Sequence, residues 1–97
     1  MLDEIFKWDE SKNKRNFLKH GISFNEAQTV FSDVMAIYLV DDEHSEYEER
    51  FIVIGESART RLLVVCHCYR ESDTIIRLIS ARKAEESEME LYYGGVI

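Results

Sequence analysis

Three apolar runs separated by short polar turns fill residues 50–82, RFIVIGESARTRLLVVCHCYRESDTIIRLISAR. Each run is rich in branched and aromatic residues, which favour extended backbone, so each predicts a β-strand. The predicted strands cover 50–54, 61–69 and 74–82. The turns between them are too short for a crossover connection, and consecutive strands should therefore run antiparallel. An antiparallel sheet is thus the centre of the predicted fold.

The flanking segments add helices and further strands. Residues 10–20 follow a good N-cap, Asp9, and end at Gly21, which suits a helix C-cap. Ser23 and Glu26 form a capping box for a second helix. That helix is expected at 24–31, short strands at 5–8 and 35–40, and a last helix at 83–93.

Together these elements predict one α+β domain that spans residues 1–97. Its sheet has four or five mainly antiparallel strands, with two N-terminal helices and one C-terminal helix. A helical layer against one face of the sheet is the economical way to bury both apolar faces. A chain of this length leaves no room for a second domain.

The charges are segregated along the chain, although the net charge is −7. No acid occurs from residue 11 to residue 25, a segment that carries four basic residues. Six acids and no Lys or Arg occur from residue 41 to residue 49. Local potential decides what a surface attracts, so the basic helix predicts a track for phosphates despite the acidic total. The predicted phosphate-binding residues are Lys12, Lys14, Arg15, Lys19 and Lys83.

No apolar run approaches the roughly 20 residues that span a bilayer, and residues 1–10 lack the pattern of a secretory signal. We therefore expect a cytoplasmic protein with no membrane contact. Cys66 and Cys68 lie two apart on one predicted strand, a poor geometry for a disulfide, and are interpreted as reduced packing residues. Alternation places His67 on the face opposite both thiols, so no metal site is expected there. No cofactor is predicted.

An ordered set of short motifs runs through most of the chain. It includes Trp8-Asp9, KHGISF at 19–24, Val30-Phe31, and IRLISAR at 76–82. From about residue 6 to residue 92 the sequence resembles the BrnT family of toxins from type II toxin–antitoxin systems. The resemblance implies a fold similar to RelE-type ribonucleases and an RNA-cleaving activity that stops growth.

The same resemblance implies a cognate antitoxin of the BrnA type. Such an antitoxin has a ribbon-helix-helix part that dimerises and binds the promoter of its operon. A toxin–antitoxin heterotetramer is expected, in which the toxin reaches promoter DNA only through the antitoxin. Charge complementarity predicts that the acidic loop 41–49 or the acidic last helix contacts this partner. The predicted partner-binding residues are Glu43, Glu46, Glu48 and Glu49.

RNA cleavage without a metal requires a base, an acid and positive charge near the phosphate. His20 is the candidate acid or base, at the end of the basic helix, and its alternative role is a helix C-cap. Arg61 opens the longest predicted strand and is placed to reach across the end of the sheet. His67 is interpreted as a half-buried structural residue rather than a catalytic one, and His44 as a structural or partner-facing residue.

Arg77 and Arg82 complete the predicted catalytic set. Arg77 interrupts an apolar run, where a guanidinium is costly unless it is functional or paired. The alternative to a catalytic role is an ion pair with Glu26 or Asp33. Simple alternation sends Arg77 and Arg82 to opposite faces of the sheet, so both serve one site only if a bulge intervenes.

Three functions are compatible with the sequence. The first is a metal-independent endoribonuclease toxin held in check by an antitoxin. The second is a non-catalytic regulatory module that docks a partner through its basic face and acidic loop. The third is a metal-binding or redox domain built on Cys66 and Cys68. The motifs favour the first, and the acidic net charge is the feature that fits it least.

Overall fold

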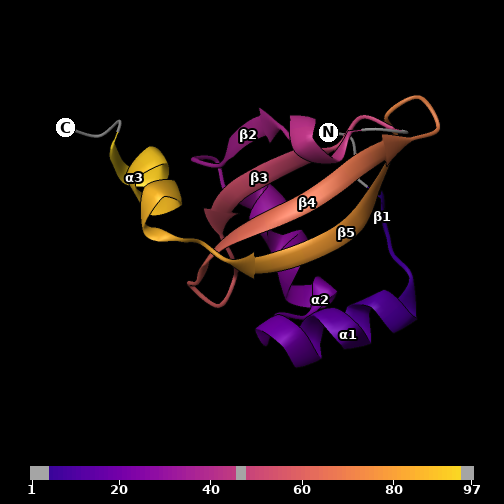
Figure 1. Ribbon diagram of the computed structural model, residues 1–97, viewed down its shortest axis with the longest axis horizontal. Helices are drawn as coiled ribbons and strands as arrows, with labels where there is room; N and C mark the ends of the chain where they lie inside the picture. The colour runs from indigo at the N-terminus through magenta and orange to yellow at the C-terminus, as the bar shows by residue number, and fades with distance from the viewer. Residues whose placement is uncertain (1–4, 46–47, 95–97) are drawn as a thin grey trace.

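The computed structural model describes residues 5–45 and 48–94, which form a mixed five-stranded sheet with helices (Figure 1). The strands are β1 Ile5–Lys7, β2 Ile37–Val40, β3 Phe51–Glu56, β4 Leu62–Arg70 and β5 Ile75–Lys83. The α-helices are α1 Glu10–His20, α2 Phe24–Ala27 and α3 Glu86–Gly94, and the 3-10 helices are η1 Gln28–Ser32 and η2 Asp42–His44. The predicted α+β class and element order are confirmed.

The sheet has the strand order β1-β5-β4-β3-β2. Strands β2 to β5 are joined consecutively and pair antiparallel, as the short turns predict. The first strand instead joins the last one in parallel, with Ile5 opposite Ile75 and Lys7 opposite Arg77. The first described strand therefore pairs with the edge of β5, which is the last strand in the sequence.

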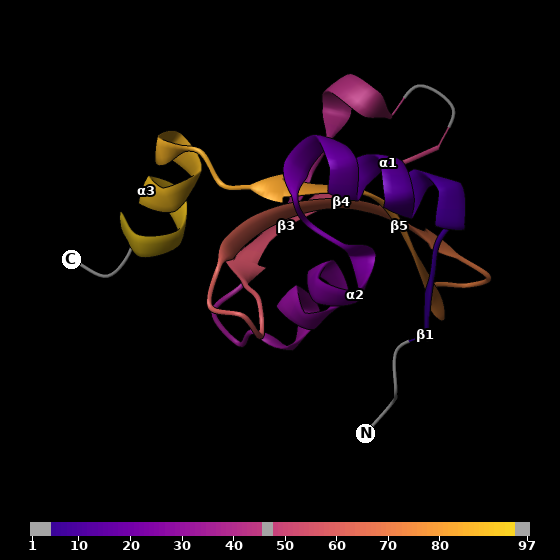
Figure 2. The same ribbon diagram turned by 90° about the horizontal axis from the view of Figure 1, so that it is seen from below.

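One face of the sheet is covered by α2 and η1, while α1 runs along the β5 side (Figure 2). Phe24, Ala27 and Val30 from this layer are completely buried. They pack against a group of sheet residues that share their face, Val53, Leu63, Val65, Ile76, Leu78 and Ala81. This apolar interface is the main core, because burial of such side chains is the dominant favourable term in folding.

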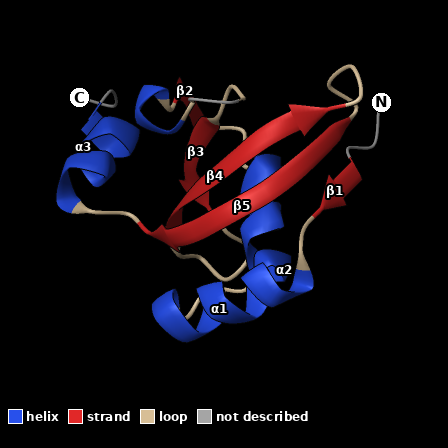
Figure 3. Ribbon diagram, turned by 45° about the vertical axis from the view of Figure 1, so that its right-hand side comes forward, coloured by secondary structure: helices blue, strands red, loops and turns tan. Residues whose placement is uncertain are grey.

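A smaller cluster lies on the opposite face of the sheet. Ile54, Val64 and Ala84 are its buried members, and Tyr92 of α3 packs against them. No side chain of α3 among the described residues is buried, and the helix stands beside the sheet rather than upon it (Figure 3). The last helix is therefore held by Tyr92, which packs on this cluster, and by Glu88, which accepts hydrogen bonds from Arg82.

The helix ends follow the predicted caps. Asp9 accepts hydrogen bonds from the backbone of Ser11 and Lys12, and Gly21 adopts the left-handed conformation with φ 73°. Ser23 accepts from the backbone of Glu26. Because α1 has a signal at both ends, its predicted bounds are the observed ones.

Several boundaries differ from the prediction, most of them by one or two residues. The second helix is α-helical only for four residues and tightens into η1. Strand β2 begins at Ile37, because residues 34 and 35 form a turn. The last helix begins at Glu86, because β5 continues through Lys83. None of the helices in the described ranges is long and apolar enough to cross a membrane.

Candidate active site

The basic helix α1 is pinned to β5 by one buried polar side chain. Asn16 bonds the backbone of Ala81 and also donates to the carbonyl of Ile22 at 2.9 Å. It is 8% exposed, so its amide satisfies backbone groups that water does not reach. The contact fixes the C-terminal half of α1 beside the end of β5.

His20 ends α1 at the same place, and Arg61 approaches it from the start of β4. The guanidinium of Arg61 donates from Nη2 to the carbonyl of Gly21, directly after His20, at 3.3 Å. It is also bidentate to Glu26, through Nε at 2.9 Å and through Nη2. Ser57 donates to the same carboxylate at 2.7 Å. The fold therefore brings Arg61 to the C-terminal end of α1, where His20 is the last residue. We call this place the corner of His20 and Arg61.

The Arg61–Glu26 pair is partly shielded from water. The side chain of Glu26 is 4% exposed and that of Arg61 is 30% exposed. Hydrogen bonds from Arg61 hold the pKa of the Glu26 carboxyl below its usual range, against the opposing effect of desolvation. Arginine has five N–H donors, and the two on Nη1 have no partner among the described residues. They are available to a phosphate oxygen.

Arg82 reaches the same end of the sheet but is held by the last helix. It is bidentate to Glu88, with Nη1–Oε1 at 2.8 Å and Nη2–Oε2 at 2.7 Å, and Glu85 lies at 3.8 Å. These hydrogen bonds raise the pKa of Arg82 and lower that of Glu88. The positive charge of Arg82 is therefore largely offset within the chain.

A β-bulge places Arg77 on the same face as Arg82. His67 pairs with Leu78 and Cys66 with Ser80, so Ile79 is the extra residue of β5. Without the bulge the two arginines would face opposite sides, as simple alternation predicts. Arg82 lies five positions after Arg77, so their Cα atoms are roughly 15 Å apart along the strand. Arg77 therefore does not join the corner of His20 and Arg61.

Arg77 instead lies at the hairpin end of β5 with other basic residues. A hollow of about 280 Å³ there is lined by Lys7, Arg70, Glu71, Ile75 and Arg77. Sequence reasoning missed Lys7 and Arg70, because the parallel β1–β5 pairing that brings Lys7 beside Arg77 has no local signal.

The alternative role of Arg77, an ion pair with Glu26 or Asp33, is wrong. Glu26 is taken by Arg61. Asp33 accepts from the backbone of Glu56 and from the hydroxyl of Tyr92, on the helical side of the sheet. Arg77 points to the other face, since its register partner is Cys68 rather than a residue of the main core.

The predicted RNA track lies mainly on the outer side of α1. Lys14, Arg15, Lys19 and Lys83 are exposed, and Lys12 is half-buried. No ion pair joins any of these five to a carboxylate among the described residues. They are thus free to meet an anionic ligand.

The acidic loop is partly folded back onto the molecule. Glu43 and Glu49 are exposed, and Glu46 lies outside the described residues. Glu48 is half-buried and pairs with Arg70 at 3.0 Å, so the loop is less solvated than its composition predicts. Of the four predicted partner-binding acids, Glu43 and Glu49 are those that the structure leaves open.

His67 is completely buried in an aromatic box of Phe31, Tyr38, Phe51 and Tyr69, with ring centroids 4.8 to 6.2 Å away. Its Nδ1 lies 3.1 Å from the carbonyl of Val65, and desolvation lowers its pKa. The interpretation of His67 as a structural residue agrees with this position.

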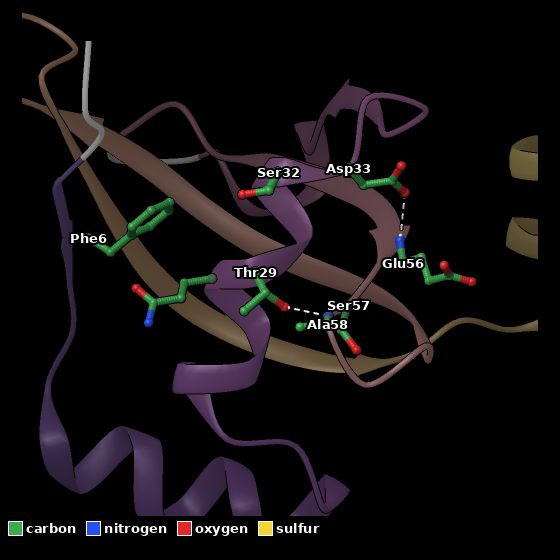
Figure 4. A pocket seen from close by; sticks show the side chains of 8 residues that line it. Phe6, Thr29, Ser32, Asp33, Glu56, Ser57 and Ala58 are labelled. Atoms are coloured by element: carbon green, nitrogen blue, oxygen red, sulfur yellow. Dashed lines mark hydrogen bonds between the residues drawn. The ribbon is translucent and has the colours of Figure 1, made fainter. Parts of the chain in front are cut away.

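A separate hollow of about 570 Å³ opens between η1 and the turn that follows β3 (Figure 4). Asp33 and Glu56 lie on its wall, and Thr29 accepts a hydrogen bond from the backbone of Ala58 at 2.8 Å. No Lys or Arg lines it among the described residues. The hollow is therefore unsuited to a phosphate.

Comparison with known proteins identifies a matching family and a similar crystal structure. The model of the family described as the ribonuclease toxin, BrnT, of type II toxin–antitoxin systems matches residues 8–88. The crystal structure of the Brucella abortus ribonuclease toxin BrnT is similar at a TM-score of 0.60, with 24% identity over 89% of this chain and 100% of that one. No curated protein matches the chain. The structural likeness supports the fold.

Proposed function

Because the chain belongs to the BrnT family of ribonuclease toxins from type II toxin–antitoxin systems, we propose that it cuts RNA internally without a metal ion. RNA is the target of such toxins, and an antitoxin is their partner. The observation that carries the proposal is the corner where α1 meets the start of β4. There the guanidinium of Arg61 is fixed on the carbonyl of Gly21, the residue that follows His20 in the chain.

This corner offers one proton-transfer group and one phosphate-binding cation for the reaction. In RNA cleavage the 2′-oxygen attacks the adjacent phosphorus and the 5′-oxygen leaves, which yields a 2′,3′-cyclic phosphate and a 5′-hydroxyl. His20 accepts or delivers a proton in this exchange, and the Nη1 donors of Arg61 bind the phosphate oxygens as charge develops on them. Glu26 fixes the guanidinium in place, so little reorganisation is needed.

The remaining basic residues serve the strand on either side of the scissile phosphate. Lys12, Lys14, Arg15 and Lys19 on α1 and Lys83 at the end of β5 bind backbone phosphates, where each contact steepens the salt dependence of binding. Arg77 and Arg82 contact the RNA beyond the reacting centre. Their predicted catalytic role is thereby reduced to substrate binding, since Arg82 is engaged by Glu88 and Arg77 is roughly 15 Å further along β5.

The test is cleavage of a defined RNA by the free protein in EDTA. The parent should cleave and leave a 2′,3′-cyclic phosphate, whereas a metal-dependent nuclease leaves a 5′-phosphate and is silenced by EDTA. His20→Ala and Arg61→Lys should each lower the rate, by about 10²–10⁴-fold for the histidine. Arg59→Ala is the matched control, because Arg59 is an exposed arginine of the same turn.

Two results would contradict the proposal. One is full activity in folded His20 and Arg61 variants, which would move the active site elsewhere. The other is the absence of cleavage both by the free protein and after addition of translating ribosomes, which would favour the non-catalytic docking module.

The partner proposed for this toxin is a BrnA-like antitoxin with a ribbon-helix-helix part, in a heterotetramer that reaches promoter DNA through the antitoxin alone. The exposed carboxylates Glu43 and Glu49 support an electrostatic contact with a basic surface. Their replacement by Gln should weaken antitoxin binding by about 2- to 5-fold per carboxylate and flatten its salt dependence. Glu71→Gln, in another exposed turn, should change neither.

A further inference from the structure

Two apolar side chains lie exposed on the basic helix α1. Phe17 is 54% and Leu18 is 85% exposed, and neither belongs to a core cluster of the described residues. A hollow of about 410 Å³ adjoins them, lined by Asn13, Lys14, Phe17, Leu18 and Ser23. Packing within the chain does not account for this pair.

Cations border the apolar pair. Lys14 precedes Phe17 by three residues and Leu18 by four, and Arg15 precedes Leu18 by three, so they are neighbours on the helix surface. The nearest acids along the helix are engaged elsewhere. Asp9 caps the helix, and Glu10 accepts from the side chains of Trp8 and Asn13.

The hollow also has a polar wall. The hydroxyl oxygen of Ser23 accepts from the backbone of Glu26 at 3.1 Å, which leaves its own O–H free to donate. Asn13 is fixed by accepting from the backbone of Phe24 at 2.8 Å. An aromatic face, a hydroxyl donor and two flanking cations are the complement of an unpaired base with its phosphates.

We propose that this hollow binds an unpaired nucleobase of the RNA substrate, with Phe17 as the stacking surface and with Lys14 and Arg15 on the adjoining phosphates. The inference rests on the proposed function in so far as RNA is the ligand. His20 follows Phe17 by three residues on the same side of α1. A base held on Phe17 therefore leads its strand toward the candidate acid or base.

The consequence is a preference for single-stranded RNA. A base inside a duplex is stacked on both sides and has no free face for Phe17. A partner protein would also cover Leu18 and Phe17, but the absence of acids from residue 11 to residue 25 favours a polyanion.

The test measures binding of a single-stranded oligoribonucleotide with 2′-O-methyl riboses, which cannot be cleaved because the attacking hydroxyl is blocked. Phe17→Ala should weaken this binding by about fivefold to a hundredfold. Phe17→Trp should retain it. An abasic oligonucleotide of equal length should bind parent and Phe17→Ala alike. Lys14→Ala should weaken both ligands.

Tyr93→Ala is the matched control, since Tyr93 is an aromatic of similar exposure, 53%, on the acidic helix α3. It should bind like the parent. Equal loss of the base-bearing and abasic ligands in Phe17→Ala would overturn the inference, because Phe17 would then act only through the helix. Unchanged RNA binding with lost antitoxin binding would overturn it too and assign the face to the protein partner.

The binding result is independent of cleavage. A base-dependent loss in Phe17→Ala supports the subsite even where the EDTA assay finds no cleavage. Cleavage in EDTA without a role for Phe17 keeps the proposed function and removes the subsite.

Discussion

The side-chain amide of Asn16 bonds the backbone of Ala81 in both directions. Its Nδ2 donates to the Ala81 carbonyl at 2.8 Å, and the Ala81 N–H donates to Oδ1 at 3.0 Å. The amide thus satisfies the backbone N–H and carbonyl of Ala81 at the edge of β5, as the backbone of a neighbouring strand would. The first strand reaches only Arg77 on that edge, so Asn16 continues the pairing further along.

Asn16→Ala should lower the free energy of unfolding by about 2–3 kcal/mol, because it leaves buried backbone groups of Ala81 and Ile22 without partners. Urea unfolding followed by circular dichroism measures this. Asn16→Asp is the sharper variant, because a carboxylate accepts from the N–H but repels the two carbonyl oxygens. Its introduced carboxyl should have a raised pKa, so the deficit against the parent should shrink as the pH falls from about 7 to about 4. A deficit that grows on acidification would contradict this geometry.

The Arg61–Glu26 pair should contribute to acid stability. The pKa of Glu26 is lowered in the folded chain from its ordinary 4.5, chiefly by the hydrogen bonds from Arg61. Stability from this carboxylate is present above about pH 4.5 and is lost as the pH falls further, because the unfolded state takes up the proton first. Glu26→Gln should therefore lower the free energy of unfolding by about 1–2 kcal/mol near neutral pH. Below about pH 4.5 the stability of this variant should depend less on pH than that of the parent. If the stability of the variant falls as steeply with acidification as that of the parent, Glu26 is not the group responsible for that pH dependence.

His67 should make the fold sensitive to mild acid. Its pKa lies below 6.5 because the ring is desolvated, and its buried Nε2 has no hydrogen-bond partner among the described residues. Above pH 6.5 both folded and unfolded states hold a neutral ring. Below that value the unfolded state binds a proton that the folded state resists, so stability should fall as the pH drops below about 6.5. His67→Phe should remove this slope. Equal slopes in parent and variant would point to another group.

Gly55 should not tolerate a side chain. A Cβ there would lie 2.8 Å from Cγ1 of Val30 and 3.2 Å from the Cβ of Ala36. Gly55→Ala should cost about 1–3 kcal/mol in thermal or urea unfolding, because the packed layer of η1 has to move. Gly94→Ala, which meets nothing within 4 Å, is the control and should be close to neutral.

The local parts of this fold could be predicted from the sequence, and the long-range parts could not. The bounds of α1 are signalled by Asp9 and Gly21, which act within one helical turn. Alternation predicts strands, but it does not say which strand Ile5–Lys7 joins, since that choice depends on a partner about 70 residues away. The bulge at Ile79 likewise leaves no mark in the sequence pattern.

The candidate site shows the same division. Arg61 and His20 were predicted from the chemistry that RNA cleavage requires. Their relation through Gly21 and Glu26 depends on contacts that span 35 to 40 residues. Glu26 was assigned to a capping box, which is correct for its N–H, yet its carboxylate serves Arg61. Residue type indicates what a side chain can do, whereas its partner is a property of the folded chain.

The parallel pairing of β1 with β5 has a consequence for synthesis. Ile5 cannot pair before Ile75 has been synthesised, and Asn16 cannot bond the backbone of Ala81 before that residue exists. Helix α1 therefore cannot dock on β5 until this last strand has been made. At translation rates of about 5–20 residues per second this delay lasts roughly 4 to 14 s. Throughout that interval the corner that unites His20 with Arg61 lacks its support from β5. The corner that we propose as the active site can therefore assemble fully only after residues 75–83 of β5 have been synthesised.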